Sequence, residues 1–142
     1  MITSPPLALL AELTHRCPLR CPYCSNPLDL VRKNEELGED EWIRLLDEAA
    51  VLGVLHVHFS GGEPAVRGEL EALVAHAARL NLYTNLITSG MLLDAKRVSA
   101  MAEIGPNHVQ LSLQDVAPDK ADRIAGKPGA FAHKLRVAAF FR

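Results

Sequence analysis

The sequence predicts an α/β protein in which strands and helices alternate and the strands form a parallel sheet. Two observations carry this prediction. Short apolar runs of strand length are separated by stretches whose apolar residues recur at helical spacing, and repeated units of this kind build parallel sheets. Cysteines, glycines and hydroxyl residues follow directly after these runs. Because ligands of such folds gather at the carboxyl ends of the strands, we expect a site at that edge.

Four segments have the length and composition of strands, and each ends next to residues with distinctive chemistry. The predicted strands are residues 7–13, 54–59, 82–88 and 108–113. The first runs into the segment that holds every cysteine, and the second runs into Ser60-Gly61-Gly62-Glu63-Pro64. Thr88-Ser89-Gly90 follows the third, and Ser112 and Gln114 lie at the end of the fourth.

The predicted helices are bounded by residues that favour helix ends. Gly38 takes the N-cap position of the first, with Glu41 three residues later, and the apolar stripe ends near Gly53. A second helix carries apolar residues from Leu70 onward and ends at Asn81, which tolerates the left-handed conformation.

A third and a fourth helix are expected in the second half of the chain. Asp94 caps the third and Gly105-Pro106 ends it, and residues 130–141 form the fourth. Residues 122–126, between the fourth strand and this last helix, are interpreted as a polar loop.

Composition limits the class of protein. With 142 residues the chain has the length of one domain, and 49% hydrophobic against 23% charged residues is typical of a globular fold. The net charge of −2 and the lack of a basic stripe argue against nucleic acid as a partner. No apolar run approaches the roughly 18 residues that span a membrane, and no leader pattern is visible. We therefore expect a cytoplasmic protein.

The three cysteines lie within eight residues, as Cys17, Cys21 and Cys24, and an odd number cannot pair off into disulfides. The simplest interpretation is that the three thiols bind one metal centre together. Structural zinc takes four protein ligands, so it would need a histidine such as His15, His56 or His58 in addition. A four-iron cluster normally takes four cysteines, so three would leave one iron open to a substrate or cofactor.

The spacing CxxxCxxC, with the aromatic Tyr23 before the last cysteine, resembles the motif of the radical S-adenosylmethionine (SAM) superfamily. The resemblance implies the N-terminal part of a partial (β/α)6 TIM-like barrel, with about four β/α units present. It also implies that the three thiolates hold a 4Fe-4S cluster and that SAM chelates the fourth iron.

The same resemblance assigns residues to the cofactor. Cys17, Cys21 and Cys24 would bind the cluster, and Tyr23 would lie near the adenine of SAM. Gly61, Gly62, Glu63 and Pro64 would receive its methionyl amino group, and Thr88 and Ser112 would contact its methionyl end. No further catalytic side chain is assigned.

A tighter resemblance covers nearly the whole chain. The segments 10–16, 23–28, 59–64 and 82–90 are similar to the coenzyme PQQ synthesis protein E family, the PqqA peptide cyclases (PqqE). The likeness implies reductive cleavage of SAM and a carbon–carbon crosslink between Glu and Tyr side chains of the PqqA precursor peptide. It further implies a peptide chaperone (PqqD) and a reductant protein such as flavodoxin as partners. Because that family is longer, we expect residues 1–142 to be a radical SAM core domain truncated after strand four, without the C-terminal auxiliary-cluster (SPASM) domain.

Two alternatives remain open. The chain could act on another precursor peptide as a different radical SAM peptide maturase. In a different class, the cysteines and His15 could form a non-enzymatic Cys3His zinc module, which would leave Gly61-Gly62-Glu63-Pro64 unexplained. His56 and His58 alternate on the second predicted strand, and we interpret them as polar side chains that line the inner face of the barrel.

Overall fold

The computed structural model describes residues 4–26 and 32–141 of the chain. Pro27 and Leu28, which belong to one of the segments that carry the resemblance, lie outside the described residues. Within them the four predicted strands and four predicted helices are confirmed, with ends that differ by at most two residues. The strands are β1 (Ala8–Glu12), β2 (His56–Ser60), β3 (Tyr83–Thr88) and β4 (His108–Leu111).

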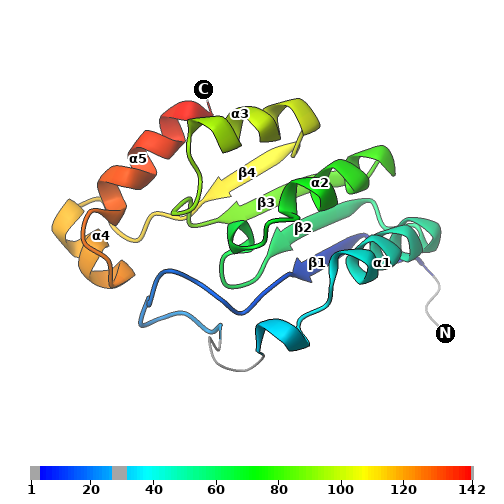
Figure 1. The fold of residues 1–142 in the computed structure, drawn as a ribbon, viewed down its shortest axis with the longest axis horizontal. Helices are drawn as coiled ribbons and strands as arrows, with labels where there is room; N and C mark the ends of the chain where they lie inside the picture. Colours follow the sequence, from blue (N-terminus) through cyan, green and yellow to red (C-terminus); the bar gives the residue numbers. More distant parts are fainter. Residues whose placement is uncertain (1–3, 27–31, 142) are drawn as a thin grey trace.

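Helices follow the strands in the order that the sequence predicts, with one additional helix between β4 and the last helix (Figure 1). The helices are α1 (Glu39–Leu52), α2 (Leu70–Arg79), α3 (Ala95–Ile104), α4 (Pro118–Ala125) and α5 (Ala130–Phe140), with short 3-10 turns η1 (Lys33–Glu35) and η2 (Pro64–Val66). In the described part of the chain, the strands form one sheet in the order β1-β2-β3-β4, and all neighbours are parallel. The register pairs Glu12 with Ser60 and Thr88 with Leu111, so the strands end at a common edge.

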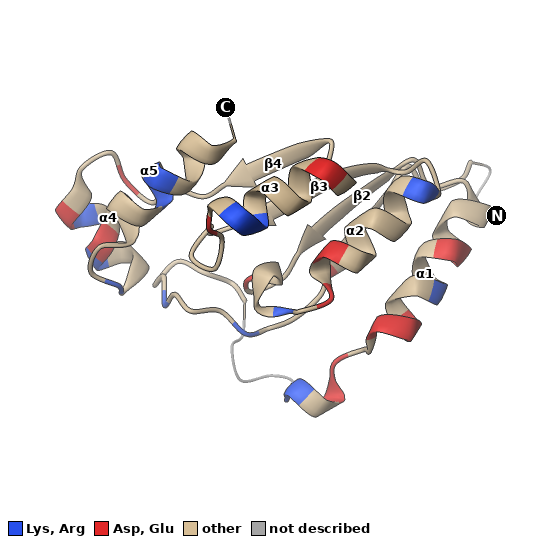
Figure 2. Ribbon diagram, turned by 45° about the horizontal axis from the view of Figure 1, so that its top comes forward, with Lys and Arg blue, Asp and Glu red and all other residues tan. Residues whose placement is uncertain are grey.

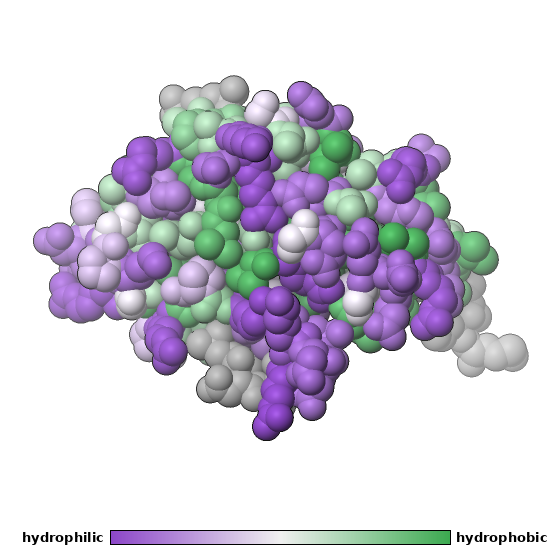
Figure 3. Space-filling model, viewed as in Figure 1, coloured by the Kyte–Doolittle hydropathy of each residue, from purple (hydrophilic) through white to green (hydrophobic). Residues whose placement is uncertain are grey.

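The core lies between one face of the sheet and the helices α1, α2 and α3, which cover it (Figure 1). Ala11, Val57, Phe59 and Leu86 point to that side and are fully buried. Strands β2, β3 and β4 contain no Lys, Arg, Asp or Glu, and the charged residues gather on helices and loops (Figure 2). Between these hydrophilic groups, hydrophobic side chains reach the surface in patches (Figure 3).

The opposite face of the sheet carries His56 and His58, which do lie on the same side, as the alternation predicts. Their rings are stacked with centroids 6.5 Å apart, and Tyr83 lies beside His56 at 5.1 Å. His58 is also hydrogen-bonded through Nδ1 to the Asn85 amide at 3.1 Å.

The predicted helix ends are confirmed. The Glu41 carboxylate accepts a hydrogen bond from the Gly38 N–H at 2.8 Å, and Gly53 ends α1 with a φ of 95°. Asn81 adopts a left-handed φ of 60°, and the Asp94 carboxylate caps α3. These local signals act over three or four residues, which is why the sequence alone reveals them.

One interpretation was wrong. Residues 122–126 belong largely to the helix α4, which begins at Pro118 and ends at a left-handed Gly126. Its buried face consists of Ala121 and Ala125, which are too small to give a hydrophobic stripe among the charged neighbours. Among the described residues, no helix combines the length and apolar character that crossing a membrane requires.

Candidate functional site

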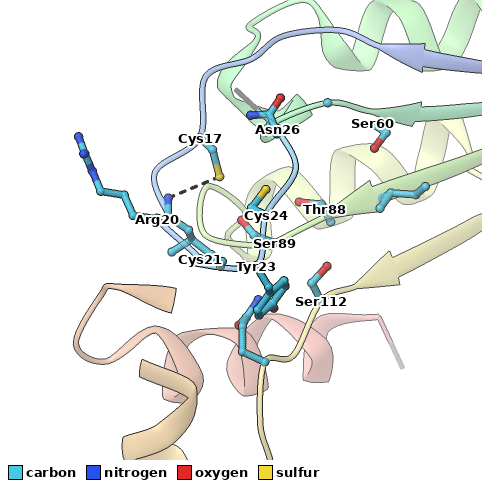
Figure 4. A pocket seen from close by; sticks show the side chains of 15 residues that line it. Cys17, Arg20, Cys21, Tyr23, Cys24, Asn26, Ser60, Thr88, Ser89 and Ser112 are labelled. Atoms are coloured by element: carbon cyan, nitrogen blue, oxygen red, sulfur yellow. Dashed lines mark hydrogen bonds between the residues drawn. The ribbon is translucent and has the colours of Figure 1, made fainter. Parts of the chain in front are cut away.

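A cavity of about 430 Å³ opens at the carboxyl edge of the sheet, between the cysteine loop and the strand ends (Figure 4). Residues from the cysteine loop, from the ends of β2 and β3 and from the segment after β4 line it. They are Cys17, Leu19, Arg20, Cys21, Tyr23, Cys24, Asn26, Ser60, Gly61, Gly62, Ile87, Thr88, Ser89, Ser112 and Gln114.

Gly61 and Gly62 hold the start of the cysteine loop against the end of β2. The Gly62 N–H donates to the Thr14 carbonyl at 2.6 Å, and the Glu63 N–H donates to the Arg16 carbonyl at 2.8 Å. A Cβ atom on Gly62 would lie 2.4 Å from the Arg16 carbonyl oxygen, and one on Gly61 would lie 2.4 Å from that of Thr14. Only glycine therefore allows the two backbones to approach this closely.

Glu63 lies beneath this contact with its side chain fully buried. Its carboxylate accepts hydrogen bonds from the Ala65 N–H at 3.0 Å, the Thr88 hydroxyl at 2.7 Å and the Ser89 N–H at 2.7 Å, and from the Ser89 hydroxyl. A buried carboxylate is tolerated only when it is satisfied in this way. Glu63 therefore ties the turn after β2 to the turn after β3.

A second carboxylate anchors the loop where it leaves β1. Glu36 accepts hydrogen bonds from the Thr14 hydroxyl and from the Arg16 guanidinium, the latter at 3.1 Å. Burial alone would raise the pKa of Glu36, but these bonds outweigh it and hold that pKa below its ordinary value.

His15 is turned toward Asn26 at the other end of the cysteine loop. Its Nδ1 lies 3.1 Å from the Asn26 Oδ1, and the Asn26 amide donates to the His15 carbonyl at 2.8 Å. This pair joins the residues on either side of the three cysteines. It closes the loop without involving a thiol.

Helices α4 and α5 support the far side of the loop. The Arg20 N–H donates to the Ala125 carbonyl at 3.0 Å, and Leu19 packs with Ala125 and Ala130 in a small apolar cluster. Cys17 and Cys21 pack against the same cluster. The helix that sequence patterning missed therefore shapes the cysteine loop.

The cysteines are free thiols, and Figure 4 shows the side chains of Cys17 and Cys24 reaching toward the space in front of the strand ends. Burial, followed by the nearby Glu63, Cys21 and Cys24 side chains, raises the pKa of Cys17, against a hydrogen bond from the Leu19 N–H that lowers it. The thiol is therefore protonated near neutral pH, and metal binding must release its proton.

Tyr23 borders the cavity beside the thiols. Desolvation and the neighbouring Cys21 raise the pKa of its phenol, whereas a hydrogen bond with Gln114 lowers it. Tyr23, from the cysteine loop, and Gln114, from the segment after β4, therefore line the same cavity.

All the site residues that the sequence predicts line this cavity except Glu63 and Pro64, which are buried and do not line it. Asn26 and Arg20, which also line it, had no assigned role. Asn26 lies within residues 23–28, one of the segments similar to the PqqA peptide cyclase family, so the sequence did contain an indication that Asn26 belongs to the site. His56 and His58 lie on the open face of the sheet and do not line the cavity.

The donor set fits an iron–sulfur cluster. In an iron–sulfur cluster each thiolate binds a different iron atom. The three sulfur atoms therefore need to surround the cavity, but they need not converge on one point as the ligands of a single metal ion do. Among residues 4–26 and 32–141, no three His, Cys, Asp or Glu side chains are grouped as ligands of a single metal ion. Of the histidines that the zinc alternative could use, His15 is directed toward Asn26, and neither it nor His56 or His58 lines the cavity.

Fold and site together define a parallel α/β domain with a three-thiol cavity at the carboxyl edge of its sheet. The chain belongs to the radical SAM superfamily, whose family model matches residues 11–142.

Within this superfamily, the chain is similar to curated proteins named PqqA peptide cyclase. The chain is 59% identical over 135 residues to a PqqA peptide cyclase of Methylocella silvestris, covering 95% of this chain and 36% of the relative. It is 57% identical over 141 residues to a PqqA peptide cyclase of Gluconobacter oxydans, covering 99% of this chain and 39% of the relative. The chain thus spans somewhat more than a third of the length of these relatives.

A solved structure shares the fold. The crystal structure of Streptococcus suis SuiB bound to S-adenosylmethionine superimposes with a TM-score of 0.84 at 26% identity, over 97% of this chain and 32% of SuiB. SuiB has also been crystallised with its precursor peptide SuiA.

Proposed function

We propose that the chain is the cluster- and SAM-binding part of a PqqA peptide cyclase, which crosslinks Glu and Tyr side chains of the PqqA peptide. The observation that carries the proposal is the cavity at the sheet edge, where Cys17, Cys21 and Cys24 meet the glycine pair after β2. The names of the curated relatives support the peptide and the PQQ pathway.

The chain's own residues would hold and orient the cofactors. The three thiolates would ligate a 4Fe-4S cluster, and Gly61, Gly62, Thr88, Ser112 and Tyr23 would contact SAM across the cavity. When bound, the reduced cluster supplies the electron that cleaves SAM to begin radical chemistry. Glu63 and Pro64, which do not line the cavity, would contribute indirectly. The Glu63 carboxylate holds the turns after β2 and β3, which carry residues that would contact SAM.

The proposal extends to the partners of the whole enzyme. A precursor peptide is supported by the relatives' name and by the peptide-bound structure of SuiB. A PqqD-type peptide chaperone and a flavodoxin-type reductant complete the proposed set. A cytoplasmic setting suits the three free thiols, since reducing compartments keep such thiols reduced.

The test is anaerobic reconstitution of the chain with iron and sulfide, followed by low-temperature EPR with and without SAM. We expect one four-iron cluster per chain, with a signal that SAM changes and that Cys24→Ala abolishes. Ser25→Ala, an exposed neighbour, is the matched control and should leave the signal intact. A colourless protein that retains one zinc ion would refute the proposal.

A further inference from the structure

Lys134 is a buried cation behind the cavity. It lies on the inward stripe of α5 between Ala130 and Val137, and its side chain is 1% exposed. Lysine is almost never buried this completely unless its charge is paired. Among the described residues, no carboxylate lies within ion-pair distance of its ammonium group.

The hydrogen bonds of Lys134 end on the cavity wall. Its Nζ donates to the Ser112 carbonyl at 2.9 Å and to the Gln114 Oε1 at 2.7 Å, and both of these residues line the cavity. An ammonium group only donates hydrogen bonds, so Gln114 must present its oxygen to Lys134. The amide nitrogen of Gln114 then remains as the atom of this side chain that can donate a hydrogen bond to another group.

The ammonium group of Lys134 lies directly behind the part of the cavity wall that Ser112 and Gln114 form. Burial lowers the pKa of its ammonium group, whereas Cys21, Glu63 and Cys17 raise it in turn. Arg20, the other cationic side chain at the cavity, extends away from it into solvent (Figure 4). Lys134 therefore places a positive charge behind the cavity that the three cysteines also line.

We infer that Lys134 is a positioning residue that sets a fixed positive charge behind the cavity and orients Gln114 as a donor, and that both raise the reduction potential of the bound cluster. The inference rests on the proposed function. Nearby positive charge and hydrogen bonds favour the more negative, reduced state of an iron–sulfur cluster.

Redox titration followed by EPR on the reconstituted chain tests this inference without measuring activity. Lys134→Met removes the charge with similar volume and should make the midpoint potential more negative. Lys134→Arg keeps the charge and should restore the potential toward that of the wild type. Lys120→Gln, an exposed lysine on α4, is the control for net charge and should leave the potential unchanged.

Gln114→Glu covers the case in which Lys134→Met does not fold. It places a carboxylate at the atom that Lys134 already contacts, neutralises the ammonium group and creates no cavity, so the potential should fall as well. If Lys134→Met and Gln114→Glu fold, bind a full cluster and keep the wild-type midpoint potential, the inference is wrong but the proposed function stands. Failure of the wild-type chain to bind any cluster would overturn the proposed function and the inference with it.

Discussion

Glycine at positions 61 and 62 is required by contact distance. Both residues border the cavity, but the atoms that exclude a side chain there are the carbonyl oxygens of Thr14 and Arg16. The glycines therefore shape the site by letting the cysteine loop dock on the end of β2. Gly61 and Gly62 thus both line the cavity and allow the close packing of two backbone segments.

Gly62→Ala should destabilise the fold by about 1–3 kcal/mol, the usual cost of inserting a methyl group where no space exists. Urea unfolding of the metal-free chain measures this cost. Gly68→Ala is the matched control, since no atom lies within 4 Å of the added Cβ and Gly68 is exposed. Equal unfolding midpoints for both variants would contradict the argument.

Sequence reasoning reached the residues that carry motifs and missed those whose role depends on tertiary position. Spacing marked the cysteines and the glycine pair because these residues are neighbours along the chain. Lys134 carries no such mark, since a lysine on an apolar stripe usually extends its ammonium group to solvent. Only the end of β4, more than 20 residues away, shows why it is buried.

At the scale of elements, the capped helices could be predicted and α4 could not. Gly38 and Asp94 are N-cap residues that indicate the start of α1 and α3, and the apolar stripes of these helices are several residues long. Helix α4 has Pro118 at its start and Gly126 at its end, but only Ala121 and Ala125 on its buried face. It packs against α5 and the cysteine loop, and no local sequence pattern encodes these tertiary contacts.

Ala125→Leu should therefore loosen the cysteine loop. Ala125 is fully buried against Leu19, and overpacking of this kind costs about 1–3 kcal/mol. In the metal-free chain we expect a lower urea midpoint and faster alkylation of the three thiols. The control is Ala102→Leu on α3, where the side chain is exposed. Unchanged alkylation rates in Ala125→Leu would show that α4 does not shape the loop.

At the scale of the whole molecule, two carboxylate–arginine pairs join segments that are distant in sequence. Glu36 holds Thr14 and Arg16 at the exit of β1. Glu69 pairs with Arg67, which in turn donates to the Leu13 carbonyl at 2.7 Å. Burial would raise the pKa of both carboxylates, but hydrogen bonds from Thr14 and Arg16 to Glu36, and from Arg67 to Glu69, hold each pKa below its ordinary value.

Both carboxylates therefore make stability depend on acid pH. A folded-state pKa below the unfolded value of 4.5 means that the unfolded chain takes up protons first as the pH falls. The contribution is complete well above pH 4.5 and is lost as the pH falls through the lower folded-state pKa. The cysteine loop should thus be held most firmly near neutral pH.

Glu36→Gln isolates one of these contributions, because the variant cannot titrate at this position. Near neutral pH it should be less stable than the wild type by about 1–2 kcal/mol, because a neutral amide accepts weaker hydrogen bonds from Thr14 and Arg16 than the carboxylate does. The difference should shrink as the pH drops below 4.5, and urea unfolding at a series of pH values measures it. Glu48→Gln is the control, since Glu48 is 66% exposed and its 3.7 Å contact with Arg44 is a surface pair of little energetic weight. A stability difference for Glu36→Gln that stays constant from neutral to acid pH would mean that the Glu36 carboxylate does not contribute through its charge.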